Sequence, residues 1–161
     1  MAQPILGPRL RRTFVQKIQA TPEQVFPLLC PELEKSWLPG WSYRMIHSRS
    51  GVAEHGAVFE TDHAGGKTLW IVIEHDLDRR VAFARWQPDG LLVHIEISLG
   101  QHHAEEATAV CISYTYTACN EQGVAALADH TEDAWTRMMG SWERSMNEWL
   151  DARRPAAEAV A

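Results

Sequence analysis

Apolar residues between positions 129 and 152 recur at spacings of three and four, which is the period of one face of an α-helix. This face is rich in tryptophan and methionine, and it consists of Trp135, Met138, Met139, Trp142, Met146, Trp149 and Leu150. An apolar stripe this wide must be covered by another layer of the fold. We therefore predict a long C-terminal helix that packs its aromatic face against a large apolar surface.

The preceding hundred residues have a different pattern, in which apolar and polar residues alternate over short segments. Such alternation predicts strands, which we place at residues 9–20, 43–49, 56–63, 68–77, 80–87, 90–100 and 106–119. The separators carry turn residues, as in Pro88-Asp89-Gly90. Because links this short join antiparallel neighbours, we expect an antiparallel meander rather than parallel strands with crossover helices.

Two short helices are predicted after the first strand. Thr21-Pro22-Glu23-Gln24 has the residues of a helix start, with a capping threonine, a proline at the first helical position and a glutamine that completes a capping box. Pro27 and Pro31 prevent one continuous helix, because proline lacks an N–H donor and clashes with the preceding turn. We expect the second helix to end near Trp37 and residues 121–128 to form a connector before the long helix.

The length of 161 residues suits one domain, which the pattern places at residues 9–152, with flexible tails at 1–8 and 153–161. The formal net charge of −6 argues against a general nucleic-acid-binding protein, which would carry a basic surface. No apolar run approaches the ~20 residues that span a bilayer, and the N-terminus lacks the apolar core of a secretory signal. We therefore expect a cytoplasmic protein without a membrane span.

The sequence contains no pattern that identifies a catalytic centre or a cofactor site. The three cysteines lack metal or redox spacing and are expected to be buried or half-buried free thiols. The eight histidines have no spacing that brings two together; His102-His103 falls in a predicted hairpin loop, and His75 stands out within an apolar strand. The patterns of a nucleophilic serine elbow and of a phosphate-binding glycine loop are both missing from the sequence. We therefore expect no metal and no cofactor, and we assign no catalytic residue.

The loop Pro88-Asp89-Gly90 fixes the register of two strands. If its glycine takes the left-handed conformation of a three-residue hairpin, Arg85 faces Val93. Alternate residues from Leu91 to Leu99 are all apolar and form the core face of the second strand. Phe83 and Arg85 are thereby placed on the inner, apolar side of the sheet.

A charged Arg85 on the inner side needs a partner, because burying a guanidinium alone is costly. A two-residue turn at Asp78-Arg79 would place Val72 opposite Arg85 and Glu74 one diagonal step away, which makes Glu74 the candidate counter-ion. The same register places Trp70 inside but turns the more apolar residues of that strand outward, a conflict that a β-bulge would explain. Arg85 either anchors a carboxylate or carbonyl of a ligand, or pairs with an acid at the rim of the sheet.

Two pairs of aromatic residues are further candidates. Tyr114 and Tyr116 share one face of the last strand, where their hydroxyls either contact a ligand and assist proton transfer, or belong to the core. Trp37 and Trp41 flank the turn after the short helices. They either cap the mouth of a pocket or fill the end of the sheet.

This order of elements resembles that of the START-like, or Bet v 1-like, superfamily over residues 9–152. The resemblance rests on Ala20-Thr21-Pro22-Glu23-Gln24-Val25-Phe26, Trp37 with Gly40-Trp41, Gly56 before a strand, and Tyr114-Thr115-Tyr116. Cys30-Pro31 with Glu34 and Trp37 further resembles a bacterial branch of the superfamily. The resemblance implies an α+β helix-grip fold, in which a seven-stranded curved antiparallel sheet surrounds a long C-terminal helix, with two short helices after the first strand. The superfamily contains carriers, polyketide cyclases and homologues of the Hsp90 ATPase activator.

Three hypotheses about function follow. The first is binding of a hydrophobic or aromatic small molecule in a cavity between the sheet and the C-terminal helix, and the second is a polyketide cyclase or aromatase that uses the same cavity. The third is an Hsp90-activator-like interaction domain, which the polar outward residues His94, Glu96 and Ser98 disfavour. A homodimer is compatible with each hypothesis. The residues expected to line the ligand site are Arg85, Glu74, Tyr114, Tyr116, Trp135, Met138, Met139, Trp142, Trp37, Trp41, Trp70 and Phe83.

Overall fold

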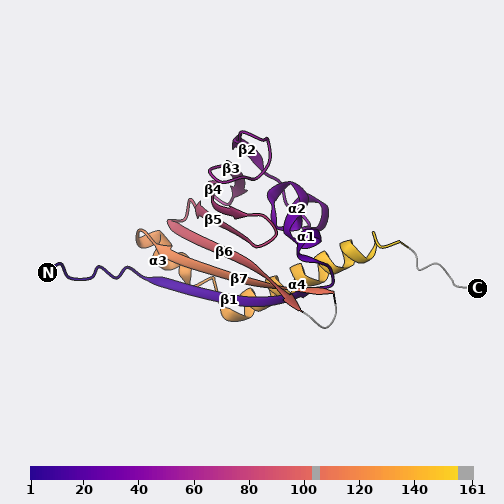
Figure 1. Cartoon of the computed structure of the whole chain (residues 1–161). Helices are drawn as coiled ribbons and strands as arrows, with labels where there is room; N and C mark the ends of the chain where they lie inside the picture. Colours follow the sequence, from indigo (N-terminus) through magenta and orange to yellow (C-terminus); the bar gives the residue numbers. More distant parts are fainter. Residues whose placement is uncertain (103–105, 156–161) are drawn as a thin grey trace, which may run out of the picture.

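The computed structural model describes residues 1–102 and 106–155 of the chain (Figure 1). In chain order the strands of this part are β1 (Arg9–Ile18), β2 (Arg44–His47), β3 (Val58–His63), β4 (Gly66–Asp76), β5 (Arg80–Trp86), β6 (Leu91–His102) and β7 (Ala107–Ala118). The helical segments are α1 (Pro22–Val25), the 3-10 helix η1 (Phe26–Leu29), α2 (Pro31–Trp37), α3 (Glu121–Leu127) and α4 (Glu132–Asp151). The predicted loop around His103 and positions 156–161 of the predicted tail lie outside the described residues.

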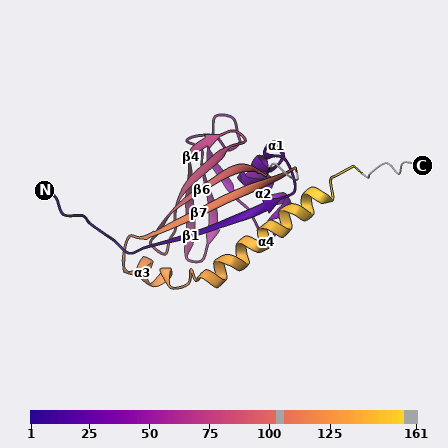
Figure 2. The same ribbon diagram turned by 60° about the horizontal axis from the view of Figure 1, so that its bottom comes forward.

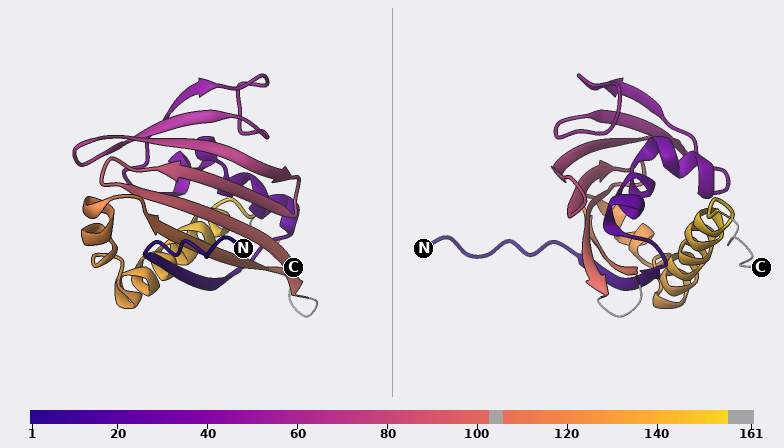
Figure 3. Two further views of the ribbon diagram at one scale, coloured as in Figure 1. Left: turned by 90° about the vertical axis from the view of Figure 1, so that its left-hand side faces the viewer. Right: turned by 45° about the vertical axis from the view of Figure 1, so that its right-hand side comes forward.

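The strands form one antiparallel sheet in the order β1-β7-β6-β5-β4-β3-β2. The sheet curls, and α1, α2 and α4 lie on its concave side (Figures 1 and 3). The long helix α4 runs beside β1, the first strand of this order (Figure 2). The predicted seven-stranded helix-grip arrangement is therefore confirmed. Within the described part of the chain, no helix combines the length and the apolar character needed to cross a bilayer.

The β5–β6 hairpin has the predicted register. The backbone N–H of Gln87 donates to the carbonyl of Leu91 at 3.0 Å, and Gly90 has a φ of 84°, as a left-handed bulge residue requires. Arg85 pairs with Val93 across the two strands. Because Val93 is fully buried, this register places Arg85 on the inner face of the sheet.

The β4–β5 hairpin departs from the predicted register. Asp76 pairs with Arg80, so the loop has three residues rather than two, and Asp78 in this loop has a φ of 63°. The register shifts once more at a β-bulge between Val72 and Glu74. The sequence pattern marked a turn at this point, but it could not distinguish a two-residue loop from a three-residue loop.

This bulge explains the conflict in the pattern of β4. Trp70, rather than Val72, pairs with Arg85. Trp70 and Val72 are both buried, while the apolar residues between and beside them are exposed on the outer face: Leu69, Ile71 and Ile73. The more apolar residues of β4 therefore do face outward, as the predicted register required.

The helix starts follow their capping residues. Thr21 and Gln24 form the predicted capping box, in which the backbone N–H of Thr21 donates to Gln24 Oε1 at 3.0 Å. At the start of α4, the hydroxyl of Thr131 accepts a hydrogen bond from the backbone N–H of Ala134 at 3.2 Å. The predicted long helix is confirmed, and it begins at Glu132, three residues after the predicted position 129.

The short helix α3 occupies the predicted connector. Its start is capped by Asn120, whose side-chain oxygen accepts a hydrogen bond from the backbone N–H of Gly123 at 2.9 Å. Gly123 packs so closely on the β5–β6 loop that a Cβ at this position would overlap the carbonyl oxygen of Gly90. A segment of seven residues containing glycine has a weak helical signal, which is why the sequence pattern missed α3.

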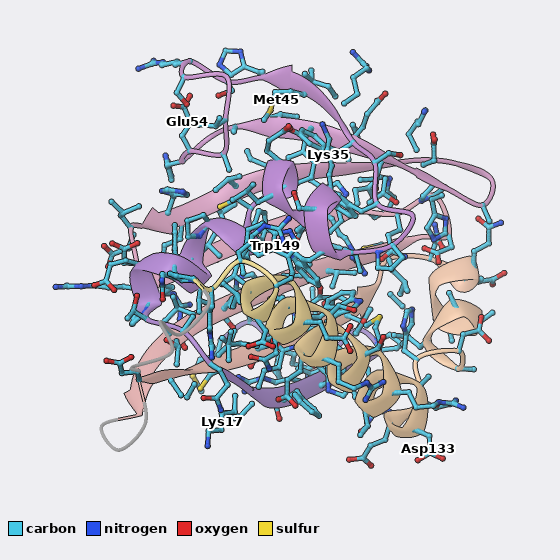
Figure 4. The ribbon with its side chains drawn as sticks, turned by 90° about the vertical axis from the view of Figure 1, so that its right-hand side faces the viewer. Lys17, Lys35, Met45, Glu54, Asp133 and Trp149 are labelled. Atoms are coloured by element: carbon cyan, nitrogen blue, oxygen red, sulfur yellow. The ribbon has the colours of Figure 1, made fainter. Side chains whose placement is uncertain are left out.

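Side chains of α4 hydrogen-bond to the backbone of β1 (Figure 4, where Lys17 marks the strand). The indole N–H of Trp135 donates to the carbonyl of Thr13 at 3.0 Å. The backbone N–H of Lys17 donates to Glu143 Oε2 at 2.8 Å. Because β1 is an edge strand, these groups have no strand partner, and the helix satisfies them instead.

Asn147 makes the most extensive contact with this edge. Its side-chain oxygen accepts a hydrogen bond from the backbone N–H of Gln19 at 2.8 Å. Its side-chain nitrogen donates to the carbonyl of Lys17 at 3.0 Å and to that of Glu143, also at 3.0 Å. The position of α4 along β1 is thus fixed by hydrogen bonds as well as by apolar packing.

Candidate functional site

A partly enclosed cavity of about 170 Å³ lies between the inner face of the sheet, α2 and α4. Its surface is mainly apolar, and only a few titratable or amide side chains face it. The residues that line it are Gln16, Leu29, Pro31, Glu34, Trp37, Leu38, Trp41, Phe59, Trp70, Phe83, Arg85, Ile95, Ile97, Ile112, Tyr114, Met138, Trp142 and Met146.

Interlocking aromatic rings form the wall on the side of the sheet. Phe59 stacks on Trp70 with ring centroids 5.3 Å apart, and Phe83 meets both rings edge-on. Trp41 meets Trp70 edge-on at 5.9 Å. Three indole N–H groups of the wall are bonded to protein acceptors: Trp37 to the carbonyl of Leu28, Trp41 to the carbonyl of Pro31, and Trp70 to Thr61 Oγ1.

The helical side of the cavity comes from α2 and α4. Met138, Trp142 and Met146 are spaced four residues apart, so they project from the same face of α4 into the cavity. Trp142 meets Trp37 of α2 edge-on at 6.3 Å. Of the helix residues that the sequence analysis placed at the site, Met138 and Trp142 line this wall, whereas Met146 was not among the predicted site residues.

Arg85 is the cation of the cavity wall. It is half-buried, and its guanidinium lies over the rings of Trp70 and Tyr114 at 4.9 Å and 5.4 Å from their centroids. Its Nε donates to Gln87 Oε1 at 3.0 Å. Among the described residues, no carboxylate lies within 4.0 Å of this guanidinium.

The expected pair between Arg85 and Glu74 does not form. Glu74 bonds instead to Arg80, whose guanidinium also contacts Glu96, at 2.7 Å and 2.6 Å respectively. The three-residue loop and the bulge of the β4–β5 hairpin place Glu74 beside Ala82, away from the cavity. The prediction of Glu74 as the counter-ion was therefore wrong.

Glu34 is a cavity residue that the sequence analysis left out of the site. It lies on α2, three residues after Pro31 and three before Trp37, and all three line the cavity. Burial raises the pKa of the Glu34 carboxyl to about 8. The carboxyl is therefore mainly protonated and uncharged at pH 7. Its helical spacing from Trp37 was the signal that could have identified it.

Gln16 is a second polar residue that the sequence analysis omitted. It is fully buried on β1, and its Nε2 donates to the carbonyl of Met139 at 2.9 Å. In the described part of the chain, no group hydrogen-bonds to its Oε1. Leaving a buried acceptor unpaired costs about 1–3 kcal/mol, so Gln16 is an unusual wall residue. Its alternation with Phe14 and Ile18 was the available signal.

The two tyrosines have different surroundings. Tyr114 lines the cavity, and burial raises the pKa of its hydroxyl well above the usual value, so the phenol stays protonated. Tyr116 lies outside the cavity and stacks on His130 with ring centroids 4.2 Å apart. Of the two tyrosines, Tyr114 is therefore the one that could contact a molecule in the cavity.

The twelve residues predicted to line the ligand site fall into two groups, those that line the cavity and those that do not. Eight of the twelve line the cavity: Arg85, Tyr114, Met138, Trp142, Trp37, Trp41, Trp70 and Phe83. Trp135 and Met139 instead belong to the contact between α4 and β1, through Thr13 and Gln16 respectively. Together with Glu74 and Tyr116, they are the four that do not line it.

The described residues contain no group of three or more His, Cys, Asp or Glu side chains that could hold a metal ion. Cys30, Cys111 and Cys119 are free thiols, but only Cys30 is half-buried; Cys111 and Cys119 are exposed, so the prediction that all three are at least half-buried was wrong. His75, the histidine within an apolar strand, packs edge-on against Phe26 with ring centroids 5.2 Å apart. Its position is therefore explained by packing.

The outer face of the sheet carries an exposed apolar row. Leu69 pairs with Trp86, and Trp86 pairs with Leu92, so the three side chains lie side by side across β4, β5 and β6. Their exposed fractions are 46%, 42% and 43%. Ile71 and Ile73 of β4 extend this row along the strand. The outer face is thus more apolar than His94, Glu96 and Ser98 alone indicate.

Comparison with known proteins gives matches in structure only. No family model matches the sequence, and no curated protein matches it. Norcoclaurine synthase from Thalictrum flavum, solved in complex with dopamine and hydroxybenzaldehyde, matches with a TM-score of 0.67 and 13% identity, covering 97% of this chain and 100% of that chain. Ara h 8.0201 matches with a TM-score of 0.64 and 13% identity, covering 89% of this chain and 99% of that chain.

The chain has the Bet v 1-like helix-grip fold. A protein from Rhodobacter sphaeroides also shares this fold, with a TM-score of 0.60 and 18% identity over 90% of this chain and 95% of that chain. At identities this low, the likeness establishes the Bet v 1-like fold alone, because one fold supports many unrelated functions. Function has to be argued from the cavity.

Proposed function

We propose that the protein binds a small aromatic molecule, of about one ring, in the cavity between the sheet, α2 and α4. The observation that carries this proposal is an apolar cavity of about 170 Å³ with an aromatic wall. An engineered apolar cavity of ~150 Å³ is sufficient to bind benzene. Met138 and Met146 supply flexible, polarizable side chains that adapt to a guest.

Arg85 is proposed to orient the polar end of the ligand. Because no carboxylate of the described residues pairs with it, this half-buried guanidinium favours an acceptor such as a carboxylate or carbonyl oxygen of a ligand. Its contacts with Trp70 and Tyr114 hold it at the cavity wall. The matching synthase was solved in complex with two single-ring aromatic molecules, dopamine and hydroxybenzaldehyde, and a guest of this size is what we propose here.

Calorimetric titration with benzoate, toluene and naphthalene-2-carboxylate tests the proposal, with tryptophan emission as a second signal. We expect benzoate and toluene to bind and the two-ring acid to bind at least tenfold more weakly. Arg85→Gln should weaken benzoate binding by about tenfold or more and leave toluene unchanged, because only the acid uses the guanidinium. Absence of heat and of any emission change with both single-ring compounds would overturn the proposal.

A polyketide cyclase or aromatase activity is a second candidate for the same cavity. It is favoured by the presence of a cation, Arg85, and a protonated phenol, Tyr114, on one wall. Such groups stabilise an enolate and deliver a proton during cyclisation. An Arg85→Ala variant that binds a short β-keto ester normally but has lost turnover supports an enzyme. Equal loss of binding supports a carrier.

An interaction domain is favoured by one separate observation, the exposed row of Leu69, Trp86 and Leu92. Such a patch marks protein contact surfaces more often than isolated apolar residues do. Sedimentation velocity of the wild type and of Trp86→Lys over a range of concentrations tests whether this face forms a homodimer. A monomer at all concentrations, for both proteins, argues against it.

A further inference from the structure

The apolar cavity adjoins an open, polar groove on the concave side of the sheet. This groove has a volume of about 330 Å³. Trp41, Trp70 and Arg85 line both the cavity and the groove, so the two spaces meet at these side chains. Most of the other side chains along the groove are polar, and His130 from the loop before α4 lies among them.

Strand alternation explains why the apolar surface becomes polar at this point. The inward-facing residues of three neighbouring strands change toward the same end of the sheet: Phe59 to Thr61 on β3, Trp70 to Thr68 on β4, and Phe83 through Arg85 to Gln87 on and just after β5. Thr61 pairs with Thr68, and Trp70 pairs with Arg85. The indole N–H of Trp70 donates to Thr61 Oγ1 at 3.0 Å. The cavity and the groove are therefore consecutive parts of one concave surface, with Arg85 at the boundary.

Two polar side chains of the groove have unused hydrogen-bonding groups. Within residues 1–102 and 106–155, no group bonds to the hydroxyl of Thr68 or to the ring nitrogens of His130. In the same part of the chain, the buried polar atoms that lack both a partner and solvent contact are Gln16 Oε1 and Trp149 Nε1. The groups on Thr68 and His130 are not in this closed set, so both can be reached from the groove. The polar side chains of the sheet that already have partners are Thr61 with Trp70, Gln87 with Arg85, His63 with the carbonyl of Ala64, and Asp62 with Lys67.

On the cavity side of the boundary, the unused polar groups are mainly donors. The Nη groups of Arg85 are unused, because its bond to Gln87 comes from Nε. The Tyr114 hydroxyl, the Trp142 indole N–H and the Glu34 carboxyl also lack a partner among the described residues. Burial keeps this carboxyl mainly protonated at pH 7, since its pKa is raised to about 8. These groups favour an acceptor, such as a carbonyl oxygen, next to the aromatic ring of the ligand.

Charge restricts the group that can follow this carbonyl into the groove. An ammonium would lie near the guanidinium of Arg85, and a carboxylate would lie near Asp62, which also lines the groove. His130 is mainly uncharged at pH 7, because burial lowers the pKa of its ring. A neutral imidazole and a threonine hydroxyl each donate and accept hydrogen bonds. An uncharged hydroxyl matches both.

We propose that the groove is the second part of the ligand site, and that the ligand is an aromatic carbonyl compound with a short hydroxyl-bearing substituent. Its ring lies in the cavity, its carbonyl oxygen lies at Arg85, and its hydroxyl bonds to Thr68 and His130. The cavity accommodates only about one ring, so a substituent beyond the carbonyl has to leave it. This inference rests on the proposed binding function and adds the chemical class of the ligand.

The test compares N-(2-hydroxyethyl)benzamide with N-propylbenzamide, which has a methyl group in place of the hydroxyl, by calorimetric titration at pH 7. We expect the wild type to bind the hydroxyethyl compound about threefold or more tightly, because only its hydroxyl can bond in the groove. Without these bonds the propyl compound would bind equally well or better, since it buries more apolar surface. The hydroxyethyl compound should also displace benzoate, because both place a ring in the cavity.

Two variants remove the groups assigned to the groove. Thr68→Val replaces the hydroxyl by a methyl group, and His130→Phe removes the ring nitrogens but keeps a ring that can stack on Tyr116. Each should lower the ratio of the two affinities, and the double variant should bring it to about one or below. Thr115→Val is the matched control, because Thr115 lines neither the cavity nor the groove. It should keep the wild-type ratio.

Each contrary outcome has a defined meaning. If the wild type binds the propyl compound as tightly as the hydroxyethyl compound, or if Thr68→Val and His130→Phe both keep the wild-type ratio, the groove inference is overturned. Simultaneous binding of benzoate and the hydroxyethyl compound also overturns it. Binding of benzoate but of neither amide overturns the inference and leaves the proposed binding function intact. Binding of none of the three compounds overturns both.

Discussion

Glu34 shows how one residue in the cavity wall ties stability to pH. In the unfolded chain its carboxyl has an ordinary pKa near 4.5, while burial raises the folded-state pKa to about 8. Between these values the folded protein holds a proton that the unfolded chain releases. Stability from this group is therefore fully present below pH 4.5 and is lost as the pH rises to 8. Above pH 8 the loss is complete.

Replacing Glu34 by glutamine removes this titration and keeps the shape of the side chain. We expect the free energy of unfolding of the wild type to fall by about 3–5 kcal/mol relative to Glu34→Gln between pH 5 and pH 9. Urea unfolding of both proteins at several pH values measures the difference. His130, whose pKa is lowered by burial, is common to both and cancels. Parallel curves for the two proteins would show that water reaches the carboxyl.

Residue-scale prediction succeeded where a strict period applied. Alternation along β5 and β6 placed Arg85 inside because the glycine of the hairpin loop fixed the register. The periodicity of the sequence also places Gln16 and Glu34 on apolar faces of their elements. It does not predict how deeply a polar side chain on such a face is buried. That depth depends on the packing of Trp37, Trp142 and their neighbours, which belong to distant parts of the sequence.

At the scale of elements, the contact between α4 and β1 determines whether the helix closes over the sheet. An edge strand leaves backbone groups unpaired, and here the side chains of Trp135, Glu143 and Asn147 pair with them. These residues lie eight and then four positions apart, so they project from one side of the helix. These bonds fix the rotation of α4 about its own axis. Met138 and Trp142 therefore face the cavity.

Removing the Asn147 side chain should weaken this contact. Asn147→Ala loses hydrogen bonds to the Gln19 N–H and the Lys17 carbonyl, and we expect it to destabilise the protein by about 1–2 kcal/mol. Glu148→Ala, a change at an exposed neighbour, should stay within about 0.5 kcal/mol of the wild type. Urea unfolding measures both. An effect of Asn147→Ala no larger than that of Glu148→Ala contradicts a role for this contact.

Element prediction failed at two points for local reasons. The β4–β5 loop gained a residue because Asp78 adopts a positive φ, and this moved Glu74 out of reach of Arg85. A single-residue change in register reverses the face of every later side chain, so the error affected a site residue directly. The helix α3 was missed because it is short and is held by a tertiary contact between Gly123 and Gly90.

At the scale of the whole molecule, the cavity exists because the large aromatic side chains between the curved sheet and the helices α2 and α4 do not fill all the space there. Gln16 on β1 and Phe59 on β3 stand far apart in the strand order, yet both line one cavity because the sheet curls around it. The pattern of the sequence predicted the sheet, the helix and most of the aromatic wall. The volume between them could not be predicted, because it depends on side-chain positions to a fraction of an ångström.

Filling the cavity should stabilise the protein and abolish binding together. Unfilled volume costs about 24 cal/mol per Å³, so a cavity of about 170 Å³ corresponds to at most ~4 kcal/mol, of which one added ring recovers a part. We expect Met138→Trp to raise the free energy of unfolding by about 1 kcal/mol, and Tm by about 2–4 °C, while benzoate binding falls at least tenfold. Met138→Leu, which conserves volume, should change both by much less.

Scanning calorimetry and titration of the three proteins measure these effects. A Met138→Trp protein that is less stable and still binds benzoate would show that residue 138 does not project into the ligand site, and the geometry proposed for the cavity would then have to be abandoned.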